Sequence, residues 1–295
     1  MRLELLGVRG STCAPGAEFV RYGGHTSCVA VRADGAAVPT LVLDAGTGLR
    51  SLTGMLDGAA FDGSILLSHL HWDHMQGLPF FAAGDRDASR VDLYLPAQDG
   101  RSGRDLLAQA FSPPAFPITP EGLKGRWTEH ALEPGSQRLE GFDVLAVEVA
   151  HKGGRTYGYR VADASGSVAY LPDHAPVAGM SDDLLAALEG VDVLLHDAQF
   201  LERERGIADD YGHATVEDCI RVATDAGVGS LVLFHHSPAR TDDALDELAE
   251  VAAGLAGDLP VVVAREGATL TVSRRAQLPS PSPAAPSSSP ASASR

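Results

Sequence analysis

Short apolar runs rich in Val, Leu and Ile recur along the chain, and Gly, Pro or Asp residues bound them. Runs of this kind predict β-strands. Twelve of them stand out, at residues 2–8, 27–33, 40–46, 64–70, 91–96, 142–150, 156–162, 167–173, 191–198, 230–236, 260–265 and 269–273. Twelve strands are many for a single sheet, so the pattern favours two sheets that face each other.

Helical periodicity appears in four segments, at residues 104–111, 181–190, 215–228 and 241–257. We expect Ser181 to cap the second of these helices. In the third, Thr215 followed by Asp218 resembles a capping box, and Gly227 is suited to ending the helix. Strands dominate the first part of the chain and helices alternate with strands later. This mixture predicts an α/β sandwich with helices on its outer faces.

The chain is long enough for one large domain, and its last part has a different composition. From residue 277 to residue 295 the sequence is a Pro/Ser/Ala tract without apolar periodicity. Such a tract has little to bury and is typical of disorder. We therefore predict a single folded domain at residues 1–276 and a disordered tail at residues 277–295.

The composition of the chain limits the kinds of partner and the cellular compartment that we expect. With 39 acidic and 23 basic residues the formal net charge is −16, which repels polyanions, so we expect no long nucleic acid as a partner. No stretch approaches the ~18 consecutive apolar residues of a membrane helix. The N-terminal segment resembles a first strand more than a signal peptide, and the three scattered cysteines fit no disulfide framework. These features favour a cytoplasmic protein.

The stretch "SHLHWDHMQG", residues 68–77, follows directly on an apolar run. If that strand continues, His69 and His71 point to the same side and aim at one point. Asp73 and His74 follow where a turn must begin, so they can reach a second point nearby. Several histidines this close together would destabilise a metal-free core unless cations or carboxylates compensated them. The spacing suits two adjacent metal ions.

The string "HLHWDH", residues 69–74, resembles the metal-binding motif of the metallo-β-lactamase superfamily. The resemblance implies an αββα sandwich of two mainly antiparallel or mixed sheets, with the metal site at one edge. It also implies three further ligands, for which His151, Asp173 and His235 are candidates. His236 remains the alternative to His235. In this family Asp44 of "LVLDAGTGL" would support the metal site, although it also fits an ordinary acid at a strand-to-turn junction.

Residues 194–240 resemble a segment of tRNA 3′-processing endonucleases and of small cyclic-phosphodiester hydrolases in the same superfamily. The resemblance implies that His213, in "GHAT", is a catalytic acid or hydrogen-bond donor, and that Asp197 orients it. The alternatives are that His213 only caps the helix beginning near Thr215 and that Asp197 is a structural acid. Only 22 positions separate His151 from Asp173, which leaves room for a hairpin but not for a long RNA-binding arm. We therefore expect a small or cyclic phosphodiester as substrate.

These observations predict a binuclear metal-dependent hydrolase with His213, Asp73 and Asp197 as catalytic residues. The predicted ligands are His69, His71, His151 and Asp173 at one ion, and Asp73, His74, His235 and Asp173 at the other. Histidine and carboxylate ligands favour Zn²⁺; Mn²⁺ is an alternative, and iron is not excluded.

Two other functions remain open from the sequence. One is hydrolysis of a lactone, thioester or β-lactam carbonyl, and the other is a non-hydrolytic di-iron sensor or redox protein. The roles of His25 and His174 also remain open. Relatives of this kind often dimerise, so a homodimer is a further expectation.

Overall fold

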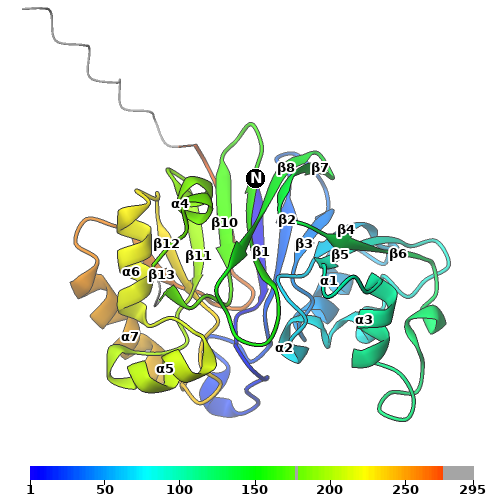
Figure 1. The fold of residues 1–295 in the computed structure, drawn as a ribbon, viewed down its shortest axis with the longest axis horizontal. Coiled ribbons are helices and arrows are strands. Elements are labelled where there is room, and N and C mark those ends of the chain that lie inside the picture. Colours follow the sequence, from blue (N-terminus) through cyan, green and yellow to red (C-terminus); the bar gives the residue numbers. More distant parts are fainter. Residues whose placement is uncertain (177–178, 275–295) are drawn as a thin grey trace, which may run out of the picture.

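The computed structural model describes residues 1–176 and 179–274, and it shows two seven-stranded sheets packed face to face (Figure 1). The first sheet has the strand order β14-β1-β2-β3-β4-β5-β6. Its strands are β1 (Arg2–Gly7), β2 (Cys28–Arg32), β3 (Leu41–Leu43), β4 (Asp62–Leu66), β5 (Arg90–Pro96), β6 (Arg126–Leu132) and β14 (Thr269–Thr271).

The second sheet has the order β13-β12-β11-β10-β9-β8-β7. Its strands are β7 (Gly135–Leu139), β8 (Phe142–Val149), β9 (Thr156–Ala162), β10 (Ser167–Leu171), β11 (Val193–Asp197), β12 (Leu231–Phe234) and β13 (Val261–Val263). The prediction of two facing sheets is confirmed. Strands β6 and β7 were not predicted, because edge strands that bury little need no continuous apolar run.

Helices cover the outer face of each sheet (Figure 1). The α-helices of the described residues are α1 (Leu49–Met55), α2 (Trp72–Met75), α3 (Gly103–Ala110), α4 (Asp182–Leu188), α5 (Arg205–Tyr211), α6 (Val216–Asp225) and α7 (Asp242–Leu255). Ser181 caps α4, and Thr215 with Asp218 forms the capping box of α6, as predicted. Gly227 follows α6 with a left-handed φ of 62°, which suits a helix end.

Three apolar clusters hold the layers together. One lies between the sheets and includes Leu43 of the first and Tyr170 of the second. A second packs the first sheet against α1 and α3, and a third packs the second sheet against α4, α6 and α7. Burial on both faces accounts for the continuous apolar runs of the central strands.

Two parallel blocks determine where polar residues can gather. Strands β3 to β6 run parallel in the first sheet, and β10 to β13 run parallel in the second. Loops that follow such strands emerge at one edge, which lies beside α2 and α5 (Figure 1). Binding residues concentrate on loops held by a rigid scaffold of this kind.

Three further expectations concern the domain boundary, the cysteines and membrane-spanning helices. The predicted domain boundary at residue 276 and the tail at residues 277–295 lie outside the described residues. Cys13, Cys28 and Cys219 are free thiols. Among the described residues, no helix combines the length and the apolar character needed to cross a membrane.

Candidate metal centre

The histidine-rich segment leaves the first sheet earlier than expected. Strand β4 ends at Leu66, and a single helical turn, α2, begins after its N-cap residue His71. His69 and His71 therefore lie in the loop after the strand. The prediction that His69 and His71 lie on a strand, and therefore share one side of it, is wrong. Their rings nevertheless meet, with centroids 4.3 Å apart.

Loops of the second sheet bring further polar side chains to the same edge. His151 follows β8, Asp173 follows β10, Asp197 ends β11 and His235 follows β12. His235 has a left-handed φ of 57°, so the alternation expected along a strand does not apply there either. His236 is directed elsewhere, because its Nε2 donates to the Ala264 carbonyl at 2.9 Å.

Asp173 lies between two groups of histidines. Its Oδ2 is 2.9 Å from His74 Nε2 and 3.3 Å from His235 Nε2, whereas its Oδ1 is 3.6 Å from His151 Nε2. His74 Nε2 and His235 Nε2 are 3.3 Å apart, and so are His71 Nδ1 and His151 Nε2. Oδ2 thus faces His74 and His235, whereas Oδ1 faces His151 on the other side of the carboxylate.

Asp73 completes the second group. Its Oδ2 lies 3.2 Å from His74 Nε2 and 3.3 Å from His235 Nε2, and it accepts the Ser11 backbone N–H at 2.7 Å. Ser11 was not singled out in the sequence, because its contact spans 62 residues and follows no local spacing. The histidine–aspartate cluster, as we call it, comprises His69, His71, Asp73, His74, His151, Asp173 and His235.

Asp44 fixes the orientation of two of these rings. This fully buried carboxylate accepts His74 Nδ1–H at 2.7 Å, the Tyr170 hydroxyl at 2.9 Å and the Ser68 hydroxyl at 2.8 Å. Because the Ser68 hydrogen is donated to Asp44, Ser68 Oγ accepts Nδ1–H of His69 at 3.0 Å. Both rings then present Nε2 to the cluster.

The donor atoms of the cluster fit divalent metal ions. His151 Nδ1–H donates to the Gly212 carbonyl at 2.6 Å, so its Nε2 also carries a lone pair into the cluster. His69 Nε2 is buried and has no hydrogen-bond partner within the described residues. Lone pairs that face one another repel unless a proton or a cation lies between them. Imidazole nitrogens and carboxylate oxygens in this arrangement suit Zn²⁺ or related ions.

The pKa values of the clustered side chains also indicate that the site attracts positive charge. Burial, reinforced by neighbouring histidines, lowers the pKa of His69 well below its ordinary value. Burial alone would also lower the pKa of His74, but the charges of Asp73, Asp173 and Asp44 outweigh it and raise that pKa strongly. Burial would raise the pKa of Asp73, but His74 and His235 lower it instead. Against the effect of burial, the pKa of Asp173 is lowered as well, chiefly by the charges of His235 and His74, so Asp73 and Asp173 are ionised and attract cations.

His213 and Asp197 form a hydrogen-bonded pair beside the cluster. His213 Nδ1 donates to Asp197 Oδ2 at 2.9 Å and lies 3.4 Å from Asp173 Oδ1. Burial would lower the pKa of His213, but the charge and hydrogen bond of Asp197 and the charge of Asp173 raise it to about 9. The side-chain cap of α6 comes from Thr215, so His213 is not needed for capping.

The remaining buried histidines lie outside the cluster. His196 Nδ1–H donates to the Asp197 carbonyl at 2.9 Å, and His174 Nδ1 lies 3.0 Å from His196 Nε2. We call these two residues the buried histidine pair. His25 contacts Thr47 Oγ1 through Nδ1 at 3.1 Å and lines a cavity of about 980 Å³ next to Trp72.

An αββα sandwich with a histidine–aspartate cluster at one edge defines a class, the metal-dependent hydrolases of metallo-β-lactamase fold. The chain belongs to this superfamily: the family model described as a beta-lactamase superfamily domain matches residues 40–236. Its relatives place it in the branch that contains the tRNA-processing enzymes. It is a phosphodiesterase-like hydrolase.

Individual relatives agree with this assignment. A ribonuclease Z from Nocardia farcinica is 32% identical over 276 residues, covering 77% of this chain and 86% of the relative. The structure of YhfI, a metallo-beta-lactamase fold protein from Bacillus subtilis, superposes with a TM-score of 0.69 at 19% identity, covering 92% of this chain and 99% of YhfI. The short form of human tRNase Z gives a TM-score of 0.64 at 19% identity, with coverages of 92% and 99%.

The expectation that no long nucleic acid is a partner is wrong. It conflicts with curated relatives named ribonuclease Z, whose name denotes RNA cleavage. The argument from charge failed because the net charge of −16 is an average over the whole surface. Bound cations and individual side chains set the local field of a cleft.

Proposed function

We propose that this protein hydrolyses phosphodiester bonds with two divalent metal ions held by the histidine–aspartate cluster. The observation that carries the proposal is the position of Asp173, whose two oxygens face separate groups of histidines. Next to it lies the His213–Asp197 pair, in reach of the same carboxylate. This combination provides two ligand groups and a proton donor around one carboxylate.

The ligands divide into two sets that share Asp173. We assign His69, His71 and His151 to one ion, and Asp73, His74 and His235 to the other. Zn²⁺ is the ion that this donor set favours, and Mn²⁺ and iron are its competitors. When bound, two such ions lower the pKa of a water molecule to near neutrality and neutralise charge on the phosphoryl oxygens.

The side chains of this chain handle orientation and protons. Asp197 accepts Nδ1–H of His213, and this leaves Nε2 as the ring nitrogen that can serve the substrate. We assign to His213 Nε2–H the protonation of the leaving oxygen. Asp197 also accepts the Ala214 backbone N–H at 3.2 Å. This hydrogen bond holds the carboxylate in place while His213 donates and regains its proton.

RNA is the substrate class that the named relatives favour. The curated relatives of this chain include ribonuclease Z enzymes, and the fold is shared with human tRNase Z. A ribose hydroxyl is a poor leaving group, so cleavage of RNA needs a general acid. The position of His213 meets that need.

The test compares two leaving groups in the metal-loaded protein. We expect His213→Ala to keep two metal ions per chain and to slow RNA cleavage by about 10²- to 10⁴-fold, the usual effect of a general acid. Bis(p-nitrophenyl) phosphate, whose leaving group needs no proton, should be hydrolysed at nearly the wild-type rate.

His130→Ala is the matched control, because His130 stacks on Tyr94 away from the cluster. Equal losses on both substrates would contradict the assignment of His213. A lactone and a cephalosporin complete the panel: turnover of either without phosphodiester cleavage would overturn the proposal. Metal analysis that found iron, with no hydrolysis, would favour a redox protein.

A further inference from the structure

A second cavity of about 240 Å³ adjoins the histidine–aspartate cluster between the start of α3 and the loop that joins β8 to β9. His69 is among its lining residues and belongs to the cluster as well. A group bound there would therefore lie next to the reacting bond. The volume is enough for several water molecules, and so for a group the size of a phosphate.

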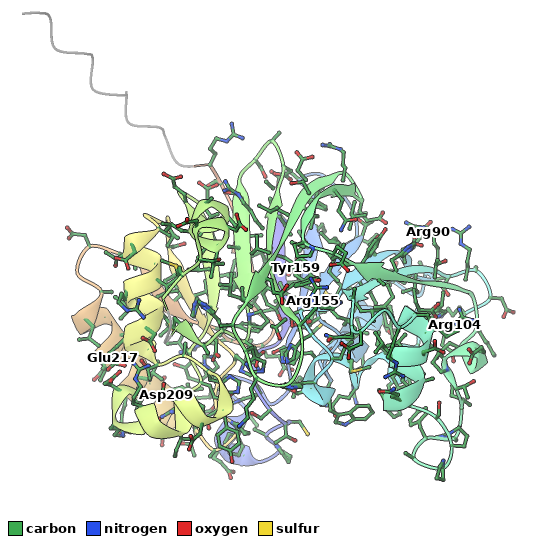
Figure 2. All side chains as sticks on the ribbon, viewed as in Figure 1. Arg90, Arg104, Arg155, Tyr159, Asp209 and Glu217 are labelled. Atoms are coloured by element: carbon green, nitrogen blue, oxygen red, sulfur yellow. The ribbon has the colours of Figure 1, made fainter. Side chains whose placement is uncertain are left out.

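Arg101 provides an uncommitted positive charge in this cavity. Its side chain is half-buried, and no ion pair joins it to a carboxylate among residues 1–176 and 179–274. The neighbouring cations differ. Arg155 contacts Glu148 at 3.1 Å and Glu133 at 2.8 Å, and Arg104 contacts Glu129 at 2.7 Å. Both of these arginines are labelled in Figure 2. Within the described residues, Arg101 is thus an unpaired guanidinium in a cavity that a residue of the histidine–aspartate cluster also lines.

Thr156 also lines this cavity, and its hydroxyl is unsatisfied. Its side chain is 1% exposed, and Oγ1 has no hydrogen-bond partner within the part of the chain that the structure describes. A buried hydroxyl without a partner costs about 1–3 kcal/mol. A bound anion would satisfy this donor and the guanidinium of Arg101 together.

The walls of the cavity are held by the β8–β9 loop. Both ends of the Gln98 amide are used: Nε2 donates to the Arg155 carbonyl at 3.0 Å, and Oε1 accepts the Arg155 N–H at 3.2 Å. Gly153 has a φ of 95°, and a Cβ there would lie 2.7 Å from His71 Nε2. Glycine therefore lets the backbone pass close to the cluster without a side chain between the cavity and the metal ligands.

We propose that this cavity binds a phosphate group adjacent to the scissile phosphodiester, with Arg101 as its charge partner and Thr156 as a hydrogen-bond donor. The inference rests on the proposed function and specifies its substrate. The preferred substrate then carries at least one phosphate besides the one attacked, as an RNA chain does. Guanidinium and hydroxyl donors are the groups that bind phosphate oxygens most effectively.

The test uses short uridine oligonucleotides with the full-length, metal-loaded protein. UpU contains only the scissile phosphate, pUpU and UpUp carry one terminal phosphate more, and UpUpU carries an internal one. We expect kcat/KM to rise at least tenfold when the further phosphate is present. Arg101→Gln should remove this gain, about tenfold to a hundredfold, and leave UpU cleavage unchanged. Thr156→Val should reduce the gain several-fold.

Arg104→Gln is the matched control. Arg104 lies three residues after Arg101 and carries the same charge, but its side chain is already paired with Glu129. An equal gain in wild type and Arg101→Gln, or no gain in wild type, would overturn the phosphate site. Comparison of UpUpU with pUpU and UpUp distinguishes an internal from a terminal phosphate. If UpU and the other compounds all resist cleavage, the proposed function is wrong. In that case calorimetry can compare the affinities of wild type and Arg101→Gln for the same compounds. Equal affinities would overturn the phosphate site independently of cleavage.

Discussion

The histidine–aspartate cluster and the buried histidine pair are both groups of buried imidazoles, and they lie on neighbouring strand ends. In the pair, His196 donates to a carbonyl and accepts from His174, so the contacts of one ring complete those of the other. In the cluster, ring nitrogens face one another and face carboxylates, and His69 Nε2 has no partner among the described residues.

Crowding of histidines alone therefore does not identify a metal site. Burial lowers the pKa of both His174 and His196, and no carboxylate lies between their rings, so both stay neutral in a network of their own. The cluster has lone pairs and negative charges that converge without enough protons to match. A bound cation would compensate these lone pairs and negative charges. The buried histidine pair has no such excess and needs no cation.

The largest expected effect comes from the residue between the two ligand groups. Asp173→Ala should remove metal from both groups and reduce turnover by more than about a thousandfold. Metal analysis and a phosphodiesterase assay measure these effects. Asp143→Ala is the control and should change neither, because Asp143 is exposed and forms an ion pair with Arg138 on the surface at 2.6 Å. Retention of both metals and of activity in Asp173→Ala would show that the cluster is no more a metal site than the pair is.

A smaller effect is expected at the carboxylate that orients the rings. Asp44→Asn should weaken metal binding by about tenfold to a hundredfold, because an amide cannot accept from His74, Ser68 and Tyr170 together. Tyr170→Phe removes a single donor and should weaken it only a few-fold. Titration with a competing chelator measures both. Unchanged affinity in Asp44→Asn would mean that the ring orientations do not depend on this carboxylate.

The smallest effect on metal binding is expected in the buried histidine pair. His196→Leu removes the acceptor of His174 and a donor to the Asp197 carbonyl, so the free energy of unfolding should fall by about 1–3 kcal/mol. The protein should still bind two metal ions per chain. Denaturant unfolding and metal analysis measure the two quantities. Loss of an ion specifically in this variant would make the pair a third ligand group and remove the contrast.

Much of the fold followed from patterns that are local in the chain. Apolar runs predicted the central strands, which are buried on both faces, and caps such as Ser181 predicted helix starts. The edge strands β6 and β7 bury too little to leave such a pattern, and the helices α1, α2 and α5, with 7, 4 and 7 residues, are too short to show a helical period. The position of His69 and His71 was predicted on a strand, but the strand ends earlier because the chain must turn into α2.

By itself the sequence determined the kind of site, because six consecutive residues already bring together four side chains that suit metal ions. It also determined the two-sheet architecture, since hydrophobic burial leaves a periodic pattern in the chain. Which histidines direct an unpaired ring nitrogen into the site, by contrast, depends on the folded arrangement. That property depends on partners far apart in the sequence: Asp44 for His74, the Gly212 carbonyl for His151, and His196 for His174. Hydrogen-bond partners are chosen by proximity in space, which residue spacing does not encode.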